Sequence, residues 1–182
     1  MRLRRTAHDG RSARLAAQVA PVSMRDFSTT VDIAAPPNRV WAVMTDVERW
    51  SEWTPTVTHI ERLDQGPLAV GSRARIRQPK LPPAVWQVSD LLEGRSFTWV
   101  TQSPGVSVIA KHSVEPVGTG ARATLSIRFS GLLGPLVARW TRRLNERYLA
   151  LEAHGLRERS TTNPTGPHRI REWPARAPEE KK

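Results

Sequence analysis

Six short segments in the middle of the chain follow one another with turn signals, and no helical segment, between them. They cover residues 57–63, 72–78, 85–91, 96–102, 106–114 and 121–130. Apolar and polar residues alternate within them, which is the pattern of strands with one buried face. The connections GPLAVG, LPP, LEGR, SPG and VGTG carry the Gly and Pro that tight turns need. Because strands joined by short turns run antiparallel, the sequence predicts an antiparallel meander.

The alternation also predicts which side of this meander is apolar. In the segment RARIR every arginine falls on one side, whereas Ala74 and Ile76 fall on the other. Residues 121–130 divide in the same way, with Leu125 and Ile127 on the apolar side. Something must therefore cover the apolar face of the sheet.

A long helix over residues 134–159 is predicted to provide this cover. Pro135 suits its first turn. An apolar stripe recurs at spacings of three and four, formed by Val137, Trp140, Leu144, Tyr148 and Leu151. The charged residues of the segment, Glu152 among them, are assigned to the remaining surface. About 25 helical residues span roughly 37 Å, enough to lie across a twisted sheet.

Before the meander the sequence predicts one strand and two short helices. Residues 27–34 alternate as a strand, and the pair Pro36-Pro37 ends it where a helix can begin. Asp46 is predicted to cap the second helix. On that helix Trp50 and Trp53, three residues apart, share one face.

The two ends of the chain differ in composition from this central region. Residues 1–23 show neither strand nor helix periodicity, and residues 161–182 are rich in proline and mixed charges, so both are predicted to be disordered. The formal net charge is +11, and the tails carry six of these charges. We therefore interpret the charge as a solvated basic surface rather than as a specific nucleic-acid site.

Composition excludes several classes of protein. The sequence has no cysteine, which excludes disulfides, thiolate metal sites and thiol nucleophiles. No histidine and carboxylate spacing matches a metal motif, and no cofactor is expected. The longest apolar runs are too short to span a bilayer, so no transmembrane segment and a cytoplasmic location are predicted.

The order of one strand, two short helices, six strands and a long helix, with the segments DVERWSEWTP, EPVGTGARATL and FSGLLGPLVARWTRRLNERYLALEAHGL, resembles the START/pollen-allergen superfamily, also called SRPBCC. More narrowly, it is similar to the polyketide cyclase/dehydrase and lipid-transport branch. The resemblance implies an α+β helix-grip fold, in which a seven-stranded curved antiparallel sheet wraps around a long C-terminal helix. It also implies a START-like ligand-binding domain over residues 24–160, with an apolar cavity between the sheet and the helix.

The cavity is predicted from this fold and from the strand faces. The residues expected to line it are Trp53, Trp86, Trp99, Val108, His112, Ile127, Trp140, Leu144 and Tyr148. Flat indole rings suit an aromatic or isoprenoid guest. The loops at residues 79–83 and 103–105 are expected to gate the mouth.

His112 is the one weak candidate for catalysis. It shares a strand face with Val108, Ala110 and Val114, and a lone histidine among apolar neighbours is more often a core residue than a general base. The resemblance implies that aromatase/cyclases use an arginine, a tyrosine and ordered water. That set does not carry over, because Tyr148 is the only tyrosine and the strand arginines face outward.

Three functions follow from these observations, in order of preference. The first is binding of a hydrophobic small molecule, lipid-like or of the aromatic polyketide type, without turnover or with weak turnover. The second is a polyketide aromatase/cyclase-type enzyme, which needs at least two polar side chains converging in the cavity. The third is salt-sensitive polyanion binding through the Arg-rich tails. The sequence predicts no oligomeric state.

Overall fold

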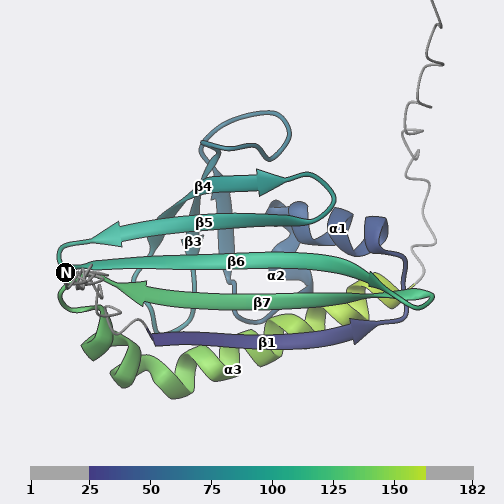
Figure 1. Ribbon diagram of the computed structural model, residues 1–182. Helices are drawn as coiled ribbons and strands as arrows, with labels where there is room; N and C mark the ends of the chain where they lie inside the picture. Colours follow the sequence, from purple (N-terminus) through teal and green to yellow (C-terminus); the bar gives the residue numbers. More distant parts are fainter. Residues whose placement is uncertain (1–24, 163–182) are drawn as a thin grey trace, which may run out of the picture.

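A computed structural model describes residues 25–162. One strand and a helical segment precede the meander, and a long helix follows it (Figure 1). The elements are β1 (Arg25–Ile33), α1 (Pro37–Thr45), a 3-10 turn (Val47–Arg49), α2 (Trp50–Trp53), β2 (His59–Arg62), β3 (Arg73–Arg77), β4 (Ala84–Leu92), β5 (Ser96–Ser103), β6 (Val106–Val117), β7 (Gly120–Ser130) and α3 (Gly134–Thr161). The predicted extensions, residues 1–23 and 161–182, lie outside the described residues, except that Thr161 ends α3 and Thr162 follows it.

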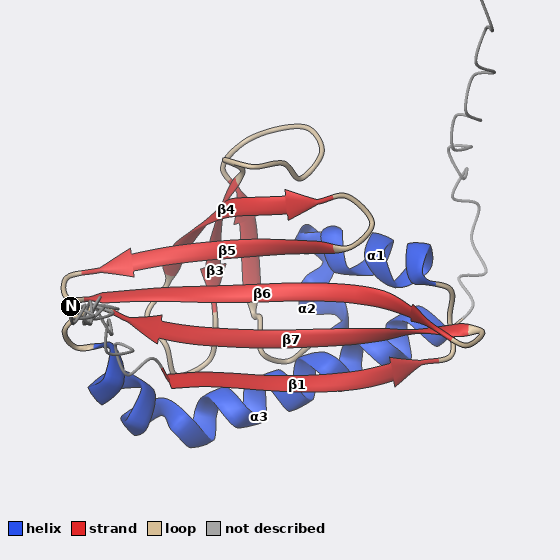
Figure 2. Ribbon diagram, in the orientation of Figure 1, coloured by secondary structure: helices blue, strands red, loops and turns tan. Residues whose placement is uncertain are grey.

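The seven strands form one antiparallel sheet in the order β1-β7-β6-β5-β4-β3-β2. The meander is therefore continuous from β2 to β7, and β1 joins it at the edge beside β7. Figure 2 shows α3 running along one side of the curved sheet, with α1 and α2 near its far end. The predicted helix-grip architecture is confirmed.

Cross-strand ion pairs fix the register of β1 against β7 on the outer face. Asp32 pairs with Arg122 opposite it, and Asp26 pairs with Arg128, with nitrogen–oxygen distances of 2.7 and 2.8 Å. Such opposite charges directly across an antiparallel pair each contribute a few tenths of a kcal/mol to about 1 kcal/mol. The apolar residues between them on β7 face the other way, because successive side chains of a strand point to opposite faces. A one-residue slip in the register would therefore turn these apolar side chains outward.

The strand faces follow the predicted alternation. On β3, Ala74 and Ile76 are buried, whereas Arg73, Arg75 and Arg77 are exposed. On β5, Phe97 and Trp99 are almost fully buried. Indole and phenyl rings of this size dominate the apolar area that holds a domain of this length together.

The predicted apolar stripe on α3 is wrong by about a third of a turn. Trp140, expected to face the sheet, is 87 % exposed, and Val137, Leu144 and Leu151 are only partly buried. The buried face instead carries Gly134, Ala138, Asn145, Leu149, Ala153, Gly155, Leu156 and Ser160. Small side chains predominate there because they let the helix backbone approach the neighbouring elements closely.

Gly155 shows how close this approach is. A Cβ atom built on it would lie 2.2 Å from the backbone oxygen of Trp53 in α2. α3 therefore touches α2 at a point where only a glycine fits. A pattern of large apolar residues does not indicate such a face, because the close contact depends on a residue without a side chain.

The segment between α1 and α2 differs from the prediction in its cap. Asp46 makes no side-chain capping hydrogen bond to the turn that follows it; its backbone N–H instead donates to Ala42 at the end of α1. The Trp50 indole N–H donates to the Met44 carbonyl, 3.1 Å away. Trp50 and Trp53 do lie on one face, with ring centroids 5.8 Å apart.

Candidate ligand-binding cavity

A cavity lies between the inner face of the sheet and α3. Its apolar wall is formed by Trp50, Val57, Ile76, Leu81, Trp86, Trp99, Ala110, Ile127 and Leu149. Its polar groups come from Gln78, His112, Ser126, Asn145, Tyr148 and Glu152. The volume open to the centres of water molecules is about 70 Å³. This space holds several waters or a compact group, and it is smaller than the roughly 300–1,000 Å³ of typical sites for drug-sized ligands.

The structure brings five of the predicted residues to this cavity: Trp86, Trp99, His112, Ile127 and Tyr148. The other four do not line it. Trp53 packs against Trp50, Val108 is partly buried at the edge of the core, and Leu144 is half-buried on α3. Trp140 points to solvent, because the face of α3 that meets the sheet lies about a third of a turn from the predicted stripe.

Ten of the lining residues are absent from the predicted set, among them Trp50, Asn145 and Glu152. The last two had a signal in the spacing. Asn145, Leu149, Glu152 and Leu156 follow one another by four, three and four residues, which places them on one helix face. Two polar residues within an otherwise buried helix face indicate a polar contact in the interior.

Glu152 brings a carboxyl group into the cavity wall. Thr56 Oγ1 donates a hydrogen bond to Glu152 Oε1 at 3.0 Å, and Thr54 Oγ1 lies 2.9 Å from Thr56 Oγ1. Both threonines are almost fully buried. Burial raises the pKa of Glu152 to about 7, and the hydrogen bond from Thr56 opposes this rise. Near neutral pH the group therefore carries a proton for about half of the time.

His112 faces the same cavity from β6. Its ring is stacked on Phe97 at 4.8 Å and lies 5.2 Å from the Trp50 ring. Its Nδ1 atom is buried without a hydrogen-bond partner within residues 25–162. Burial lowers the pKa of His112 to about 3, so the imidazole is neutral at physiological pH.

The segment between β3 and β4 closes over the cavity beside α3. It contributes Gln78 and Leu81 to the lining, and the Tyr148 hydroxyl donates a hydrogen bond to the Pro79 carbonyl. Lys80 lies in the left-handed region with a φ of 63°. The other predicted gate, residues 103–105, packs instead on the start of α3, where the Leu133 N–H donates to the Gly105 carbonyl at 2.9 Å.

The cavity can therefore hold a neutral guest and offer it directional hydrogen bonds. A protonated Glu152 donates to a carbonyl or hydroxyl oxygen, whereas an ionised one would have to be desolvated at a cost. Within the described part of the chain, no three His, Cys, Asp or Glu side chains come together in a way that could hold a metal ion. No helix in residues 25–162 has the length and hydropathy needed to cross a bilayer.

The family model described as polyketide cyclase / dehydrase and lipid transport matches residues 24–161. Comparison with curated protein sequences finds no match.

Solved structures with the same fold include the Zhui aromatase/cyclase from Streptomyces sp. R1128, with a TM-score of 0.62 and 20 % identity over 75 % of this chain and 93 % of that one. A START superfamily protein from Mycobacterium smegmatis has a TM-score of 0.60 and 19 % identity over 75 % of this chain and 99 % of its own. Ara h 8.0201 has a TM-score of 0.55 and 12 % identity over 73 % and 97 %. At these identities the likeness establishes the fold alone.

Proposed function

Because the chain belongs to the polyketide cyclase/dehydrase and lipid transport family of the START superfamily, we propose that it binds a hydrophobic small molecule between its sheet and α3. The observation that carries this proposal is the composition of the cavity wall. Three indole rings, those of Trp50, Trp86 and Trp99, line it together with the carboxyl group of Glu152. An apolar wall with a few convergent polar groups is the usual form of a small-molecule site.

The ligand class follows from the charge state of these groups. A guest that carries a carbonyl or hydroxyl oxygen accepts a hydrogen bond from the protonated Glu152, and its rings pack against the indoles. A carboxylate guest would place a second negative charge beside a carboxyl group whose pKa is already raised to about 7. We therefore propose that the ligand is neutral and aromatic or polycyclic, and that the protein binds it in the cytoplasm.

The size of the cavity adds a requirement. A polycyclic guest needs more room than the present 70 Å³, so binding has to move the segment that carries Leu81. The hydrogen bond from Tyr148 to Pro79 is the contact that such an opening breaks. A ligand-binding loop of this kind belongs to the least stable part of a fold.

Native mass spectrometry of the purified full chain tests the proposal directly, since a tightly held apolar guest co-purifies. Ala110→Phe fills the cavity from β6, and it is expected to lower the affinity for the co-purified compound, or for the neutral dye N-phenyl-1-naphthylamine, by at least about tenfold. Ala150→Phe on the exposed face of α3 is the matched control and should bind normally. Equal binding by both variants and the unaltered protein would contradict an internal site.

A second candidate function is cyclase-type catalysis, which Glu152 favours specifically. An aldol cyclisation needs a base that removes a proton from a methylene and an acid that protonates the ketone oxygen as the new C–C bond forms; loss of water then follows. A group whose pKa lies near the working pH suits such proton transfers, and Glu152 meets this condition, whereas the neutral His112 is a weak base. In this proposal His112 contacts the ligand.

The two candidates are separated by incubation with an aryl polyketone that can close a six-membered ring. Release of one water from the probe, detected by mass spectrometry, and its loss in Glu152→Gln with binding retained would support the enzyme. Binding of the probe without any change in its mass would leave the carrier function alone.

A further inference from the structure

The start of α3 exposes an unusual concentration of large apolar side chains. Leu132 is 96 % exposed, Leu136 66 % and Trp140 87 %, and Leu133 between them is 48 % exposed. We refer to these four residues as the Leu–Trp patch. Exposed leucines occur singly on most proteins, but a contiguous group that includes a tryptophan marks an interaction surface.

The side chains of the Leu–Trp patch belong to the outer face of the molecule and not to the hydrophobic core. Leu136 and Trp140 are four residues apart in α3, so they follow one line that points away from the face packed on the sheet, and Leu132 lies exposed in the turn just before the helix. The helix is anchored on that opposite face by Gly134, which approaches Phe129, and by Ala138. The outward line is therefore left for something outside the described chain.

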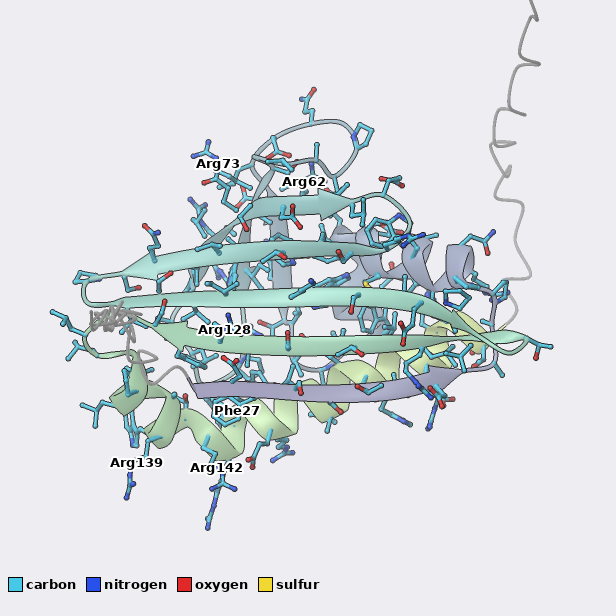
Figure 3. All side chains as sticks on the ribbon, in the orientation of Figure 1. Phe27, Arg62, Arg73, Arg128, Arg139 and Arg142 are labelled. Atoms are coloured by element: carbon cyan, nitrogen blue, oxygen red, sulfur yellow. The ribbon has the colours of Figure 1, made fainter. Side chains whose placement is uncertain are left out.

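Basic residues lie beside this line and extend the exposed face toward the C-terminus. Arg139, Arg143 and Arg147 are exposed on the outward face, and within residues 25–162 none of them forms an ion pair. Their neighbour Arg142 differs, because it pairs with Glu146 at 2.8 Å. Figure 3 shows Arg139 and Arg142 extending from α3 away from the sheet.

We propose that the Leu–Trp patch, together with Arg139, Arg143 and Arg147, docks the protein on a membrane surface that contains anionic lipids. Tryptophan and leucine side chains enter the boundary between headgroups and acyl chains, and arginines beside them pair with lipid phosphates. The protruding side chains suit a fluid surface, which closes around them, better than a rigid partner that would need matching pockets.

A second copy of this chain fits the surface less well. A two-fold contact through the Leu–Trp patch would bring the arginines of both copies close together, and such like charges repel. An anionic lipid surface removes this repulsion and adds an attraction. The charge on this face therefore favours lipid over self-association.

The position of the patch gives the docking a consequence for the cavity. Trp140 lies eight residues before Tyr148 on the same helix, about 12 Å along its axis. Tyr148 holds the segment that closes over the cavity. Docking therefore brings that segment close to the lipid surface, although the docking itself does not depend on what the cavity binds.

Vesicle flotation of the full chain tests the proposal. The protein is expected to bind vesicles of phosphatidylcholine mixed with phosphatidylglycerol more tightly than phosphatidylcholine alone. The double variant Leu136→Ser, Trp140→Ser should lose at least about tenfold in affinity for the mixed vesicles. The matched control Val70→Ser, Leu92→Ser removes exposed apolar side chains elsewhere and should bind normally.

Charge is tested in the same assay. Replacing Arg139, Arg143 and Arg147 with Gln should weaken binding, whereas the same change at Arg73, Arg77 and Arg95 removes equal charge from other exposed sites and should not. Equal loss in both triple variants, or unchanged binding by the Leu136→Ser, Trp140→Ser variant, would overturn the proposal. The proposal would also be overturned if light scattering showed that the unaltered protein is a dimer and that the Leu136→Ser, Trp140→Ser variant is a monomer.

Discussion

The hydroxyl of Thr56 donates a 3.0 Å hydrogen bond to Oε1 of Glu152, from a position that is itself completely buried. The bond uses one carboxyl oxygen and leaves the other for the cavity. Since Thr56 is held in turn by Thr54, the acid has a fixed orientation without an opposite charge beside it. This arrangement makes Glu152 sensitive to pH in a range where ordinary carboxyl groups do not titrate.

We expect the contribution of Glu152 to the stability of the protein to fall as the pH rises. Its pKa is about 7 in the folded chain and near 4.5 when unfolded, so between these values the folded state holds a proton that the unfolded state lacks. The contribution of Glu152 to the free energy of unfolding should therefore drop by up to about 3 kcal/mol between pH 4.5 and 7, and stay constant outside this range. Urea unfolding of Glu152→Gln should lack this component.

The exposed Glu48 provides the control for this measurement. Glu48→Gln should keep the pH profile of the unaltered protein, because the carboxyl group lies outside the interior. A Glu152→Gln profile that matches the unaltered one would show that the carboxyl group reaches water.

His112 should have the opposite effect on stability. The pKa of His112 falls from 6.5 to about 3 on folding, so between these pH values the unfolded state binds a proton that the folded state lacks. The free energy of unfolding should therefore decrease as the pH falls from 6.5 to about 3. The full effect is about 5 kcal/mol as an order of magnitude. His112→Phe, which keeps a ring against Phe97, should resist acid unfolding better than the unaltered protein.

Between pH 4.5 and 6.5 the two slopes oppose each other and nearly cancel. The unaltered protein should then show a plateau that each single variant replaces by a slope, rising with pH in Glu152→Gln and falling in His112→Phe. Two parallel profiles from the single variants would contradict the assignment of both groups.

The sequence predicted the sheet well because its information is local. The alternation of residues on β3 predicts that Ala74 and Ile76 point inward. The glycines in the turns indicate where each strand ends. The placement of α3 depends on tertiary packing, and there the prediction followed side-chain size. Trp140 was expected inside, but Ala138 and Gly155 make the close contacts, and the bulky residue is left outside.

The candidate site was predicted mainly where it rests on strands, and on α3 only Tyr148 was predicted correctly. Trp86, Trp99 and His112 follow from strand faces, and all three line the cavity. Glu152 was assigned to the outer surface because a charged residue on a helix usually lies there. Its position depends on the buried Thr56, 96 residues earlier in the chain, and no local pattern contains that contact.

Gly155 offers a test of the packing of α3. An alanine normally stabilises a helix interior by about 1 kcal/mol relative to glycine. Here the added Cβ would meet the backbone oxygen of Trp53 at 2.2 Å, so Gly155→Ala should destabilise the protein by about 1–3 kcal/mol. The exposed Ala150 gives the reverse control, since Ala150→Gly should cost only the propensity difference. A stabilised Gly155→Ala variant in thermal unfolding would show that α2 and α3 are further apart.

Tyr148 should control how fast a ligand enters the cavity. The Tyr148→Phe variant keeps the ring but removes the hydroxyl that donates to the Pro79 carbonyl. Loss of one such hydrogen bond, about 1 kcal/mol, should make the segment between β3 and β4 open about five times more often. Hydrogen exchange at the Leu81 amide, which donates to Gln78 at 3.3 Å, should accelerate by this factor. Association of the hydrophobic dye should accelerate with it, since the same opening admits both water and ligand.

Thr30→Val is the matched control for this loss, because it removes the hydrogen bond to Thr124 on the outer face of the sheet. It should leave both rates unchanged. Faster exchange at Leu81 without faster dye association would mean that the segment is mobile but does not lie on the entry route. An unchanged exchange rate in Tyr148→Phe would mean that Leu81 is held by its own packing against the cavity wall, and the role of the tyrosine as a latch would then be wrong.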